Sequence, residues 1–445
     1  MITIKPGFSF LGLCLFIFMF QSQVALAAYT LVYSGNLNGE LEPCGCTLEG
    51  DFGGIKRQVS MIDQLRQKNP DLMFVSSGGL LIAEMPSDRI RSDYILRGMK
   101  LLNYDVIGVQ ARDLAFGTEF LTHHQLPFIL SNSTTSSVFS YKKTLRRQSQ
   151  AFSFFQWSAL PAQSMLKDVN AKSSTAVKQL RQKLIREKKS GAITVVTTTL
   201  RLSEAKKILP LKYIDLLIIP SRRDTFTEPM QIDNTLLLQP GARGMRFGVL
   251  QFGIKKHGRE ARIADWRHKV IPLPQTLPDS PRTEAWYAAY NAELKADYEK
   301  QVRLRTQLEQ GKSPYAGAEK CRNCHLPEYQ KWKHTQHALA YEDLESVGKN
   351  FDPNCIGCHS VGFNRPGGFL NTELTPHLAS VQCESCHGPA QAHVDSIGKK
   401  PTGNQQWDKT KMCAQCHIGN HSPSFKLETY WPKVAHGKKT KAVEP

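Results

Sequence analysis

The sequence predicts a chain of two unlike folds: an α/β layered region whose sheet is covered on both faces, then a mostly helical region organised around bound cofactors. Two observations predict this division. Residues 29–270 alternate short apolar runs with helical periodicity, and the last quarter of the chain carries one cysteine–histidine motif four times. With 445 residues, 41% hydrophobic and 22% charged, the chain is long enough for two or three domains.

Residues 1–27 have the features of a secretory signal peptide. Lys5 precedes the apolar run FSFLGLCLFIFMF, and Ala-Leu-Ala at 25–27 offers a cleavage site before Ala28. An uncleaved membrane anchor is the alternative, although the run is short for a span. We therefore expect a mature bacterial protein without a transmembrane anchor, either periplasmic or secreted to the cell surface.

Residues 28–275 form the predicted α/β domain. Its candidate strands are near-continuous apolar runs, and the patterns between them place apolar residues on one helix face, as in Ile55, Val59 and Ile62. Such strands are typical of a sheet buried on both faces. The candidate strands are 29–34, 72–77, 105–109, 127–130, 192–198, 214–220 and 235–239.

A glycine-rich turn, GELEPCGC, follows the first candidate strand and contains Cys44 and Cys46. The turn after a strand is where an α/β sheet commonly keeps its ligands. Three roles stay open for the two cysteines. They could form a structural disulfide, which would be strained at this spacing, a metal or cofactor ligand pair, or a redox-active dithiol.

Residues 276–313 are the predicted helical linker between the two regions. A proline-rich run ends the first region, and Ser280 and Pro281 suit the start of a helix. We expect this helix to pack across both domains through one aromatic face, with a dimer seam in a homo-oligomer or a charged spacer as the alternatives. That face consists of Tyr287, Tyr290, Leu294, Tyr298 and Val302.

Residues 314–445 carry the strongest signal, the pentapeptides CRNCH, CIGCH, CESCH and CAQCH. C-x-x-C-H is the attachment sequence of c-type haem, in which two thiols bond one haem and the histidine binds its iron. Paired zinc sites are the alternative, but they leave unexplained why a histidine ends each of the four motifs. The motifs predict four covalent haems on Cys321, Cys324, Cys355, Cys358, Cys383, Cys386, Cys413 and Cys416, with His325, His359, His387 and His417 as proximal iron ligands.

The same region is rich in further histidines, ten of the 14 in the chain lying after Lys320. This enrichment suits iron bound by two histidines, a six-coordinate state that transfers electrons without binding a substrate. Four haems on so short a chain would themselves be the core of a mostly helical fold.

The net charge of +18 is spread over several separate runs, among them KKTLRRQ, RQKLIREKK and KKHGREAR. A solvated surface is the simplest interpretation of most of them. Nucleic acid is excluded as a partner by the predicted export, and we expect acidic redox partner proteins.

The run YAGAEKCRNCHLPEYQKWKHTQHA, with CESCHGPAQAH and WPKVAHG, resembles the tetrahaem cytochrome c that takes electrons from hydroxylamine oxidoreductase in nitrifying bacteria. The resemblance implies that three haems are bis-histidine and that the second, on Cys355 and Cys358, lacks a distal ligand. By motif, it implies that the distal ligands are His337, His393 and His436. His377 and His421 are alternatives for the second haem.

The N-terminal region resembles the degenerate 5′-nucleotidase branch of calcineurin-like metallophosphoesterases, through LVYSGNLNGELEP, GGIKRQVSMIDQLR, VSSGGLL and IGVQARDLAFG. That family holds two metal ions with Asp, His and Asn side chains at strand ends. Here the corresponding positions are Asn36 and Asn38, Gly79, and Ala111 to Asp113, which cannot hold two divalent cations. The resemblance therefore implies a metallophosphoesterase-like fold that has lost its hydrolytic site, in which the C-G-C turn occupies the ligand position.

Two functions remain. The first is an exported electron carrier, whose nucleotidase-like domain docks a partner or performs thiol redox chemistry at Cys44 and Cys46. The second is an oxidoreductase that transforms a small substrate at these cysteines or at an open second haem. Residual phosphoesterase activity would need ligands that the strand ends lack.

Overall fold

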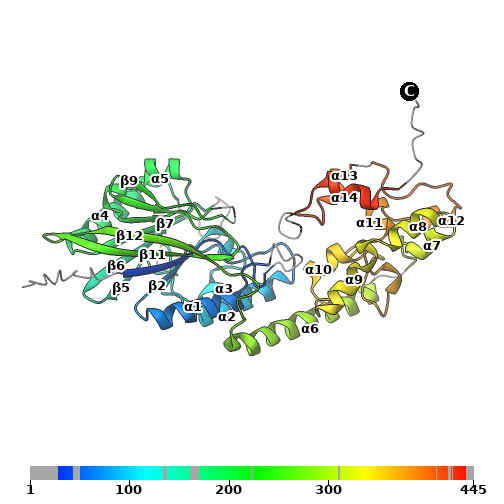
Figure 1. Cartoon of the computed structure of the whole chain (residues 1–445), viewed down its shortest axis with the longest axis horizontal. Helices are drawn as coiled ribbons and strands as arrows, with labels where there is room; N and C mark the ends of the chain where they lie inside the picture. Colours follow the sequence, from blue (N-terminus) through cyan, green and yellow to red (C-terminus); the bar gives the residue numbers. More distant parts are fainter. Residues whose placement is uncertain are drawn as a thin grey trace, which may run out of the picture.

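The computed structural model describes residues 29–436 except 44–50, 134–137, 161–169, 222, 224, 309–310, 407, 419–421 and 423. The predicted signal peptide, Cys44, Cys46 and His421 lie outside the described residues. Figure 1 shows two sheets with flanking helices on one side of the molecule and the short haem-motif helices on the other, joined along one edge by α6 (Glu284–Leu308).

The N-terminal part contains two six-stranded sheets packed face to face. The first has the order β12-β11-β1-β2-β3-β4, with β1 parallel to β2 and antiparallel to β11. Its strands are β1 Tyr29–Ser34, β2 Met73–Ser76, β3 Val106–Gly108, β4 Phe128–Ile129, β11 Arg246–His257 and β12 Glu260–Pro272.

The second sheet has the order β5-β6-β7-β8-β10-β9, in which β6, β7, β8 and β10 are parallel. Its strands are β5 Lys142–Arg147, β6 Gln150–Trp157, β7 Ile193–Thr198, β8 Leu216–Ile218, β9 Met230–Ile232 and β10 Thr235–Leu238.

Side chains alternate between the two faces of each strand, so each sheet contributes to two cores. On β1, Leu31 and Tyr33 point into the core between the sheets, while Val32 points to the outer core beneath the helices. On β7, Ile193 and Val195 face the other sheet and Val196 faces α4. The result is a four-layer α/β/β/α arrangement, which confirms the predicted α/β layering and explains why the strands read as continuous apolar runs.

Helices cover both outer faces, with α1, α2 and α6 over the first sheet and α4 and α5 over the second. All seven predicted strands are present. The helical segments are α1 Ile55–Lys68, α2 Asp88–Leu102, η1 Ala111–Leu114, α3 Thr118–Thr122, α4 Ser174–Lys189, α5 Leu202–Ile208, η2 Leu211–Tyr213 and η3 Pro281–Thr283.

Helix α6 packs against both parts of the chain. Tyr290 and Leu294 belong to the core of the first sheet, and Tyr298 and Val302, two turns further on, belong to the core of the C-terminal part. Phe351 lies against both cores. The apolar face predicted for this helix is therefore buried along its length, and α6 is a shared structural element, not a spacer.

The C-terminal part consists of short helices and loops with one small apolar core. Its buried side chains include Tyr341, Ile356 and Phe369. The helices are α7 Ala318–Arg322, α8 Leu326–Lys333, α9 Gln336–Ser346, α10 Pro353–His359, η4 Pro376–Leu378, α11 Cys383–His387, α12 Gln391–Asp395, α13 Lys409–Cys413 and α14 Leu427–Val434. No helix in the described ranges is long and apolar enough to cross a bilayer.

Candidate metal centre

Each C-x-x-C-H motif lies on or directly after one short helix: α7, α10, α11 and α13. The backbone N–H of His325 donates to the carbonyl of Cys321 at 2.9 Å, and that of His417 donates to Cys413 at 2.8 Å. One helical turn therefore brings the first cysteine and the histidine of a motif to the same face, as covalent attachment of one haem requires.

The four motifs lie close together. The thiols of Cys321 and Cys383 form a hydrogen bond, which is the main reason that the pKa of Cys321 is raised. The thiols of Cys358 and Cys416 also form a hydrogen bond, and this bond is the main reason that the pKa of Cys416 is raised. Motifs far apart in the sequence are thus neighbours in space.

Three pairs of histidine rings face one another across the motifs. His325 lies 6.2 Å from His393, His337 lies 6.0 Å from His417, and His387 lies 5.8 Å from His436, measured between ring centres. A metal ion bound about 2 Å from a nitrogen of each of two imidazoles holds the ring centres roughly 6 Å apart. The spacing of all three pairs therefore suits one iron between the two rings.

The second ring nitrogen of several of these histidines has an oxygen partner. His393 Nδ1 bonds the Lys400 carbonyl at 2.7 Å, His417 Nδ1 bonds Ser422 Oγ at 3.0 Å, and His436 Nδ1 bonds the Val434 carbonyl at 2.8 Å. His359 Nδ1 contacts the Ala340 carbonyl. An Nδ1–H held by an oxygen leaves Nε2 with a free lone pair for a metal, which is the usual arrangement of a ligating histidine.

Burial favours the neutral imidazole in this cluster. It lowers the pKa of His337, with the neighbouring His417 acting in the same direction. Burial likewise lowers the pKa of His387 and of His417. Neutral imidazole is the form that binds iron, so the electrostatics agree with the ring spacing.

His359, the histidine of the second motif, differs from the other three. Within the described ranges, no histidine ring stands opposite it as His393 stands opposite His325. His377 is exposed on η4, where its side chain lies against Gly317.

Residues of all four motifs line a cavity of about 2510 Å³. Its wall includes the paired histidines and also residues from the N-terminal part, such as Asn38, Glu42 and Arg112. A site for one drug-sized ligand measures about 300–1,000 Å³. The cavity volume, the thiol and imidazole groups and the ring spacing therefore fit several c-type haems, and the eight motif cysteines would hold them.

Two buried carboxylates hold the motif helices, and the sequence alone did not single them out. Asp352 caps α10 by accepting from the Asn354 N–H at 2.9 Å. Glu384, inside the third motif, accepts from the N–H groups of Gly317 at 2.8 Å and Ala390 at 2.7 Å. The Asp-Pro pair before CIGCH is a recognisable capping signal. Glu384 has no such local signal, because two of its donors, the N–H groups of Ala316 and Gly317, are more than 60 residues away in the sequence.

The N-terminal part contacts the second motif directly. Lys349, shortly before α10, donates to Glu42 Oε2 at 2.8 Å and to Asn291 Oδ1 at 2.9 Å. Tyr287 of α6 also donates to Glu42. Because Glu42 precedes the C-G-C turn by two residues, this network places the described start of that turn beside the approach to the second motif.

The strand ends that would hold metals in a phosphoesterase are filled by a hydrogen-bonded amide network. Gln110 Nε2 donates to Asn36 Oδ1 at 2.7 Å and to the Ser77 carbonyl at 2.8 Å, and Arg112 donates to Asn38 Oδ1 at 2.7 Å. A Cβ at Gly79 would lie 2.7 Å from the Asn36 side chain, and its φ of +68° favours glycine. Among the described residues, no group of three or more His, Cys, Asp or Glu side chains is arranged to hold a metal ion.

Asp113 is the fully buried carboxylate of this network, and it holds the Gly78–Gly79 turn. It accepts from the N–H groups of Gly79 at 2.8 Å, Leu80 at 2.6 Å and Gln110 at 2.8 Å. Burial raises the pKa of Asp113, and the backbone donors oppose that rise. Its partners indicate a structural role.

Replacement of Asp113 by alanine should therefore lower the free energy of unfolding by about 3 kcal/mol, because three buried donors lose their acceptor. Urea unfolding followed by circular dichroism measures the loss. The control is Glu119→Ala on the neighbouring α3, an exposed site expected to change stability by less than about 0.5 kcal/mol. Equal losses in the two variants would contradict the structural role.

Comparison with known proteins separates the two parts of the chain. Residues 320–388 match the family model of cytochrome c554 and c-prime. The curated cytochrome c-554 of Nitrosomonas europaea is 31% identical over 145 residues, an alignment that covers 26% of this chain and 62% of that protein. This similarity confirms the predicted resemblance of the C-terminal part, which is a cytochrome c554-like domain.

The solved structures similar to this chain match its N-terminal part. A 5′-nucleotidase precursor from Thermus thermophilus has a TM-score of 0.49 and 14% identity, covering 60% of this chain and 59% of its own. A calcineurin-like phosphoesterase from Bacillus subtilis has a TM-score of 0.45 and 14% identity, covering 59% and 97%. The chain thus spans about three fifths of both the curated cytochrome and the nucleotidase precursor. These structural similarities give no information about the activity of this chain.

Proposed function

We propose that this chain is an exported electron carrier with four covalently bound c-type haems, one on each C-x-x-C-H motif, and a nucleotidase-like domain that does not hydrolyse phosphoesters. The observation that carries the proposal is the three histidine pairs at 5.8–6.2 Å, each joining the histidine of one motif to one outside it. Bound haem iron supplies a one-electron couple.

In this proposal the protein holds and orients the irons. His325, His387 and His417 would be the proximal ligands, and their distal partners would be His393, His436 and His337 respectively. The Nδ1 contacts of His393, His417 and His436 fix those three rings. Thiol hydrogen bonds between the first and third motifs and between the second and fourth motifs place these motifs side by side, which would allow electrons to pass between their haems.

The absence of a histidine ring opposite His359 in the described part of the chain favours a second function at that motif. There the protein would leave one iron position open to a small ligand, and the chain would be an oxidoreductase or a ligand-responsive carrier. Thiol redox chemistry at Cys44 and Cys46 remains a prediction, supported by the contact of Glu42 with Lys349. Residual phosphoesterase activity receives no support from the amide network at the strand ends.

The proposed use of the N-terminal domain as a docking or thiol module is supported by its contact with the cavity, because the hydrogen-bonded pair Asn38 and Arg112 at its strand ends lines the cavity wall. The redox partners would be proteins that approach the haem motifs. The N-terminal apolar run supports export to the periplasm or cell surface.

Purification of the haem-loaded chain and a reduced-minus-oxidised spectrum test this proposal. We expect sharp α and Soret bands and a haem-to-protein ratio of four, because the sequence has four motifs. The variant Cys413→Ala/Cys416→Ala should reduce the ratio by one haem. A ratio unchanged by this variant, or a protein without haem bands when expressed with a haem-attachment system, would contradict the proposal.

A further inference from the structure

Three basic runs that are separate in the sequence meet at one end of the N-terminal domain. They are the β5–β6 turn region 142–150, helix α4 with its C-terminal turn 174–190, and the β11–β12 hairpin 254–262. Together these segments hold fourteen Lys and Arg against two Asp and Glu. We call this surface the basic end.

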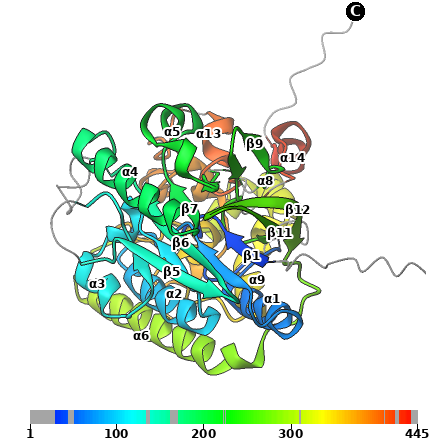
Figure 2. The same ribbon diagram turned by 90° about the vertical axis from the view of Figure 1, so that its left-hand side faces the viewer.

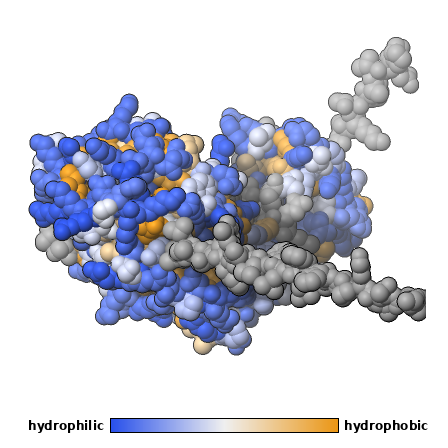
Figure 3. All heavy atoms as spheres, turned by 60° about the vertical axis from the view of Figure 1, so that its left-hand side comes forward, coloured by the Kyte–Doolittle hydropathy of each residue, from blue (hydrophilic) through white to orange (hydrophobic). Residues whose placement is uncertain are grey.

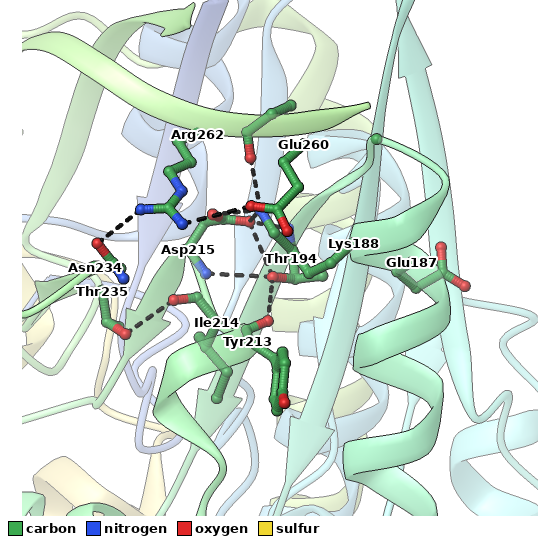
Figure 4. A network of polar contacts seen from close by, with 12 residues as sticks. Glu187, Lys188, Thr194, Tyr213, Ile214, Asp215, Asn234, Thr235, Glu260 and Arg262 are labelled. Carbon is green, nitrogen blue, oxygen red and sulfur yellow. Dashed lines mark hydrogen bonds and ion pairs between the residues drawn. The ribbon is translucent and has the colours of Figure 1, made fainter. Parts of the chain in front are cut away.

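Hydrogen bonds join the three segments. Gln150 Nε2 donates to the Gly191 carbonyl at 2.7 Å, which ties the β5–β6 turn to the end of α4. Lys188 donates to the Ala261 carbonyl at 2.5 Å, which ties α4 to the hairpin. Figure 4 shows Lys188 close to Glu260 and Arg262 of the hairpin and to Asp215, with which it pairs at 2.8 Å.

The basic end is opposite the haem motifs. The cavity lies at the carboxyl ends of the parallel strands, where Asn38 after β1 and Arg112 after β3 line its wall. The basic end instead surrounds the start of β1, since Tyr29 pairs with Phe252 and its ring lies 5.1 Å from Phe152. Figure 2 views the molecule from this side, with the motif helices behind, and Figure 3 shows a mostly hydrophilic surface.

Many of these charges are exposed and are not neutralised by carboxylates. The ion pairs found in the described ranges involve five of the fourteen basic residues: Lys142, Arg147, Lys188, Lys255 and Arg262. Lys143, Arg146, Arg186, Lys189, Lys256 and Arg259 are exposed.

The charge is also unequal along the chain. Residues 314–436 hold 12 Lys and Arg against 11 Asp and Glu, so the excess behind the net charge of +18 lies mainly outside the haem-motif region. A redox partner must approach the haem motifs, whereas the basic end is at the far side of two sheets. The basic end is therefore poorly placed to guide a redox partner to the haem motifs. We infer that it binds an anionic partner other than the redox protein.

Two features identify a lipid surface as that partner. Trp266, 37% exposed on the edge strand β12, lies beside the basic end, and tryptophan is enriched where proteins meet the membrane interface. Clustered Lys and Arg bind anionic lipid headgroups.

We propose that the basic end docks on an anionic lipid bilayer, with the haem motifs directed away from the membrane toward redox partners. This inference goes beyond electron transfer and stands independently of the haem count.

Vesicle flotation of the haem-loaded mature chain tests the proposal, with the Soret absorbance of the vesicle fraction as the readout. We expect binding to vesicles of phosphatidylcholine with phosphatidylglycerol, no binding to phosphatidylcholine alone, and release by salt. The hairpin variant Lys255→Glu/Lys256→Glu/Arg259→Glu should bind about 100-fold more weakly.

The matched control is Lys295→Glu/Lys300→Glu/Arg303→Glu, which makes the same change in net charge on the exposed side of α6. It should bind within about threefold of the unmodified chain. Equal weakening of both variants, equal binding to both vesicle types, or no effect of the hairpin variant would overturn the proposal. So would retention on immobilised polyglutamate under salt conditions that release the protein from the anionic vesicles, because the partner would then be an acidic protein.

Discussion

Replacement of His393 by alanine is expected to open a second iron to external ligands. His393 faces His325 with ring centres 6.2 Å apart, and its Nδ1 is held by the Lys400 carbonyl at 2.7 Å. Without the imidazole, His325 would be the one histidine left to bind an iron at the first motif, and a haem held there would be five-coordinate and high-spin. Carbon monoxide should then shift a larger share of the reduced Soret band than it does in the unmodified protein. In the unmodified protein, the proposed open position is the one opposite His359.

The control for this experiment is His334→Ala, which removes an exposed histidine of the same region. It should leave the carbon monoxide response and the low-spin spectrum unchanged. If His393→Ala behaves like His334→Ala, His393 is not an axial ligand, and the pairing of motifs proposed above is wrong.

Replacement of Arg91 by methionine should lower the free energy of unfolding by about 3–5 kcal/mol, the usual cost of removing one partner from a buried ion pair. Arg91 Nη2 lies 3.6 Å from the Asp352 carboxylate, and Arg91 Nη1 lies 3.9 Å from that of Asp88. Burial lowers the pKa of Arg91, but Tyr290 and Asp352 outweigh this effect and raise it, so the side chain stays charged. Loss of Arg91 would leave Asp352, the cap of α10, buried without a cation.

The same helix offers a matched control, Arg97→Met, which removes an ion pair with Asp93 at 2.7 Å on a half-exposed surface. That pair should contribute less than about 1 kcal/mol. Denaturant unfolding read by the Soret band and by far-ultraviolet circular dichroism measures both variants. The double variant Arg91→Met/Asp352→Asn should recover part of the loss, because it removes the uncompensated charge. Equal stability of Arg91→Met and Arg97→Met would show that the contact between the domains carries little energy.

The sequence predicted seven strands whose residues are mostly apolar on both faces. It missed β6, although Phe154 and Phe155 are buried on its opposite faces, because polar residues interrupt its apolar run. β1, β7 and β10 are continuous apolar runs because helices cover one side and the second sheet covers the other. β5, with the sequence KKTLRR, is an edge strand in which Leu145 is the buried residue, and no apolar run marks it. α2 was missed for a related reason, since it buries Asp88 and Ser92 beside its apolar residues.

The candidate site, like the fold, could be predicted from the sequence only in part. Haem attachment was predictable because each motif is five consecutive residues whose geometry one helical turn supplies. The face-to-face histidines could be named only through resemblance to a family, because His337 and His417 come together through the tertiary fold. The ion pair of Arg91 with Asp352 could not be predicted, although the Asp-Pro pair marks Asp352 as a helix cap. A buried charge is acceptable only beside its partner, and these partners are far apart in the sequence.

Helix α6 has a consequence for the cavity as a whole. Its single apolar face is built into the sheet core at Tyr290 and into the cytochrome core at Tyr298. Turning or sliding the helix in one half would pull out the side chains it buries in the other, so the two halves keep one mutual orientation. The cavity wall, which draws on both halves, is therefore an enclosure that neither half could form alone.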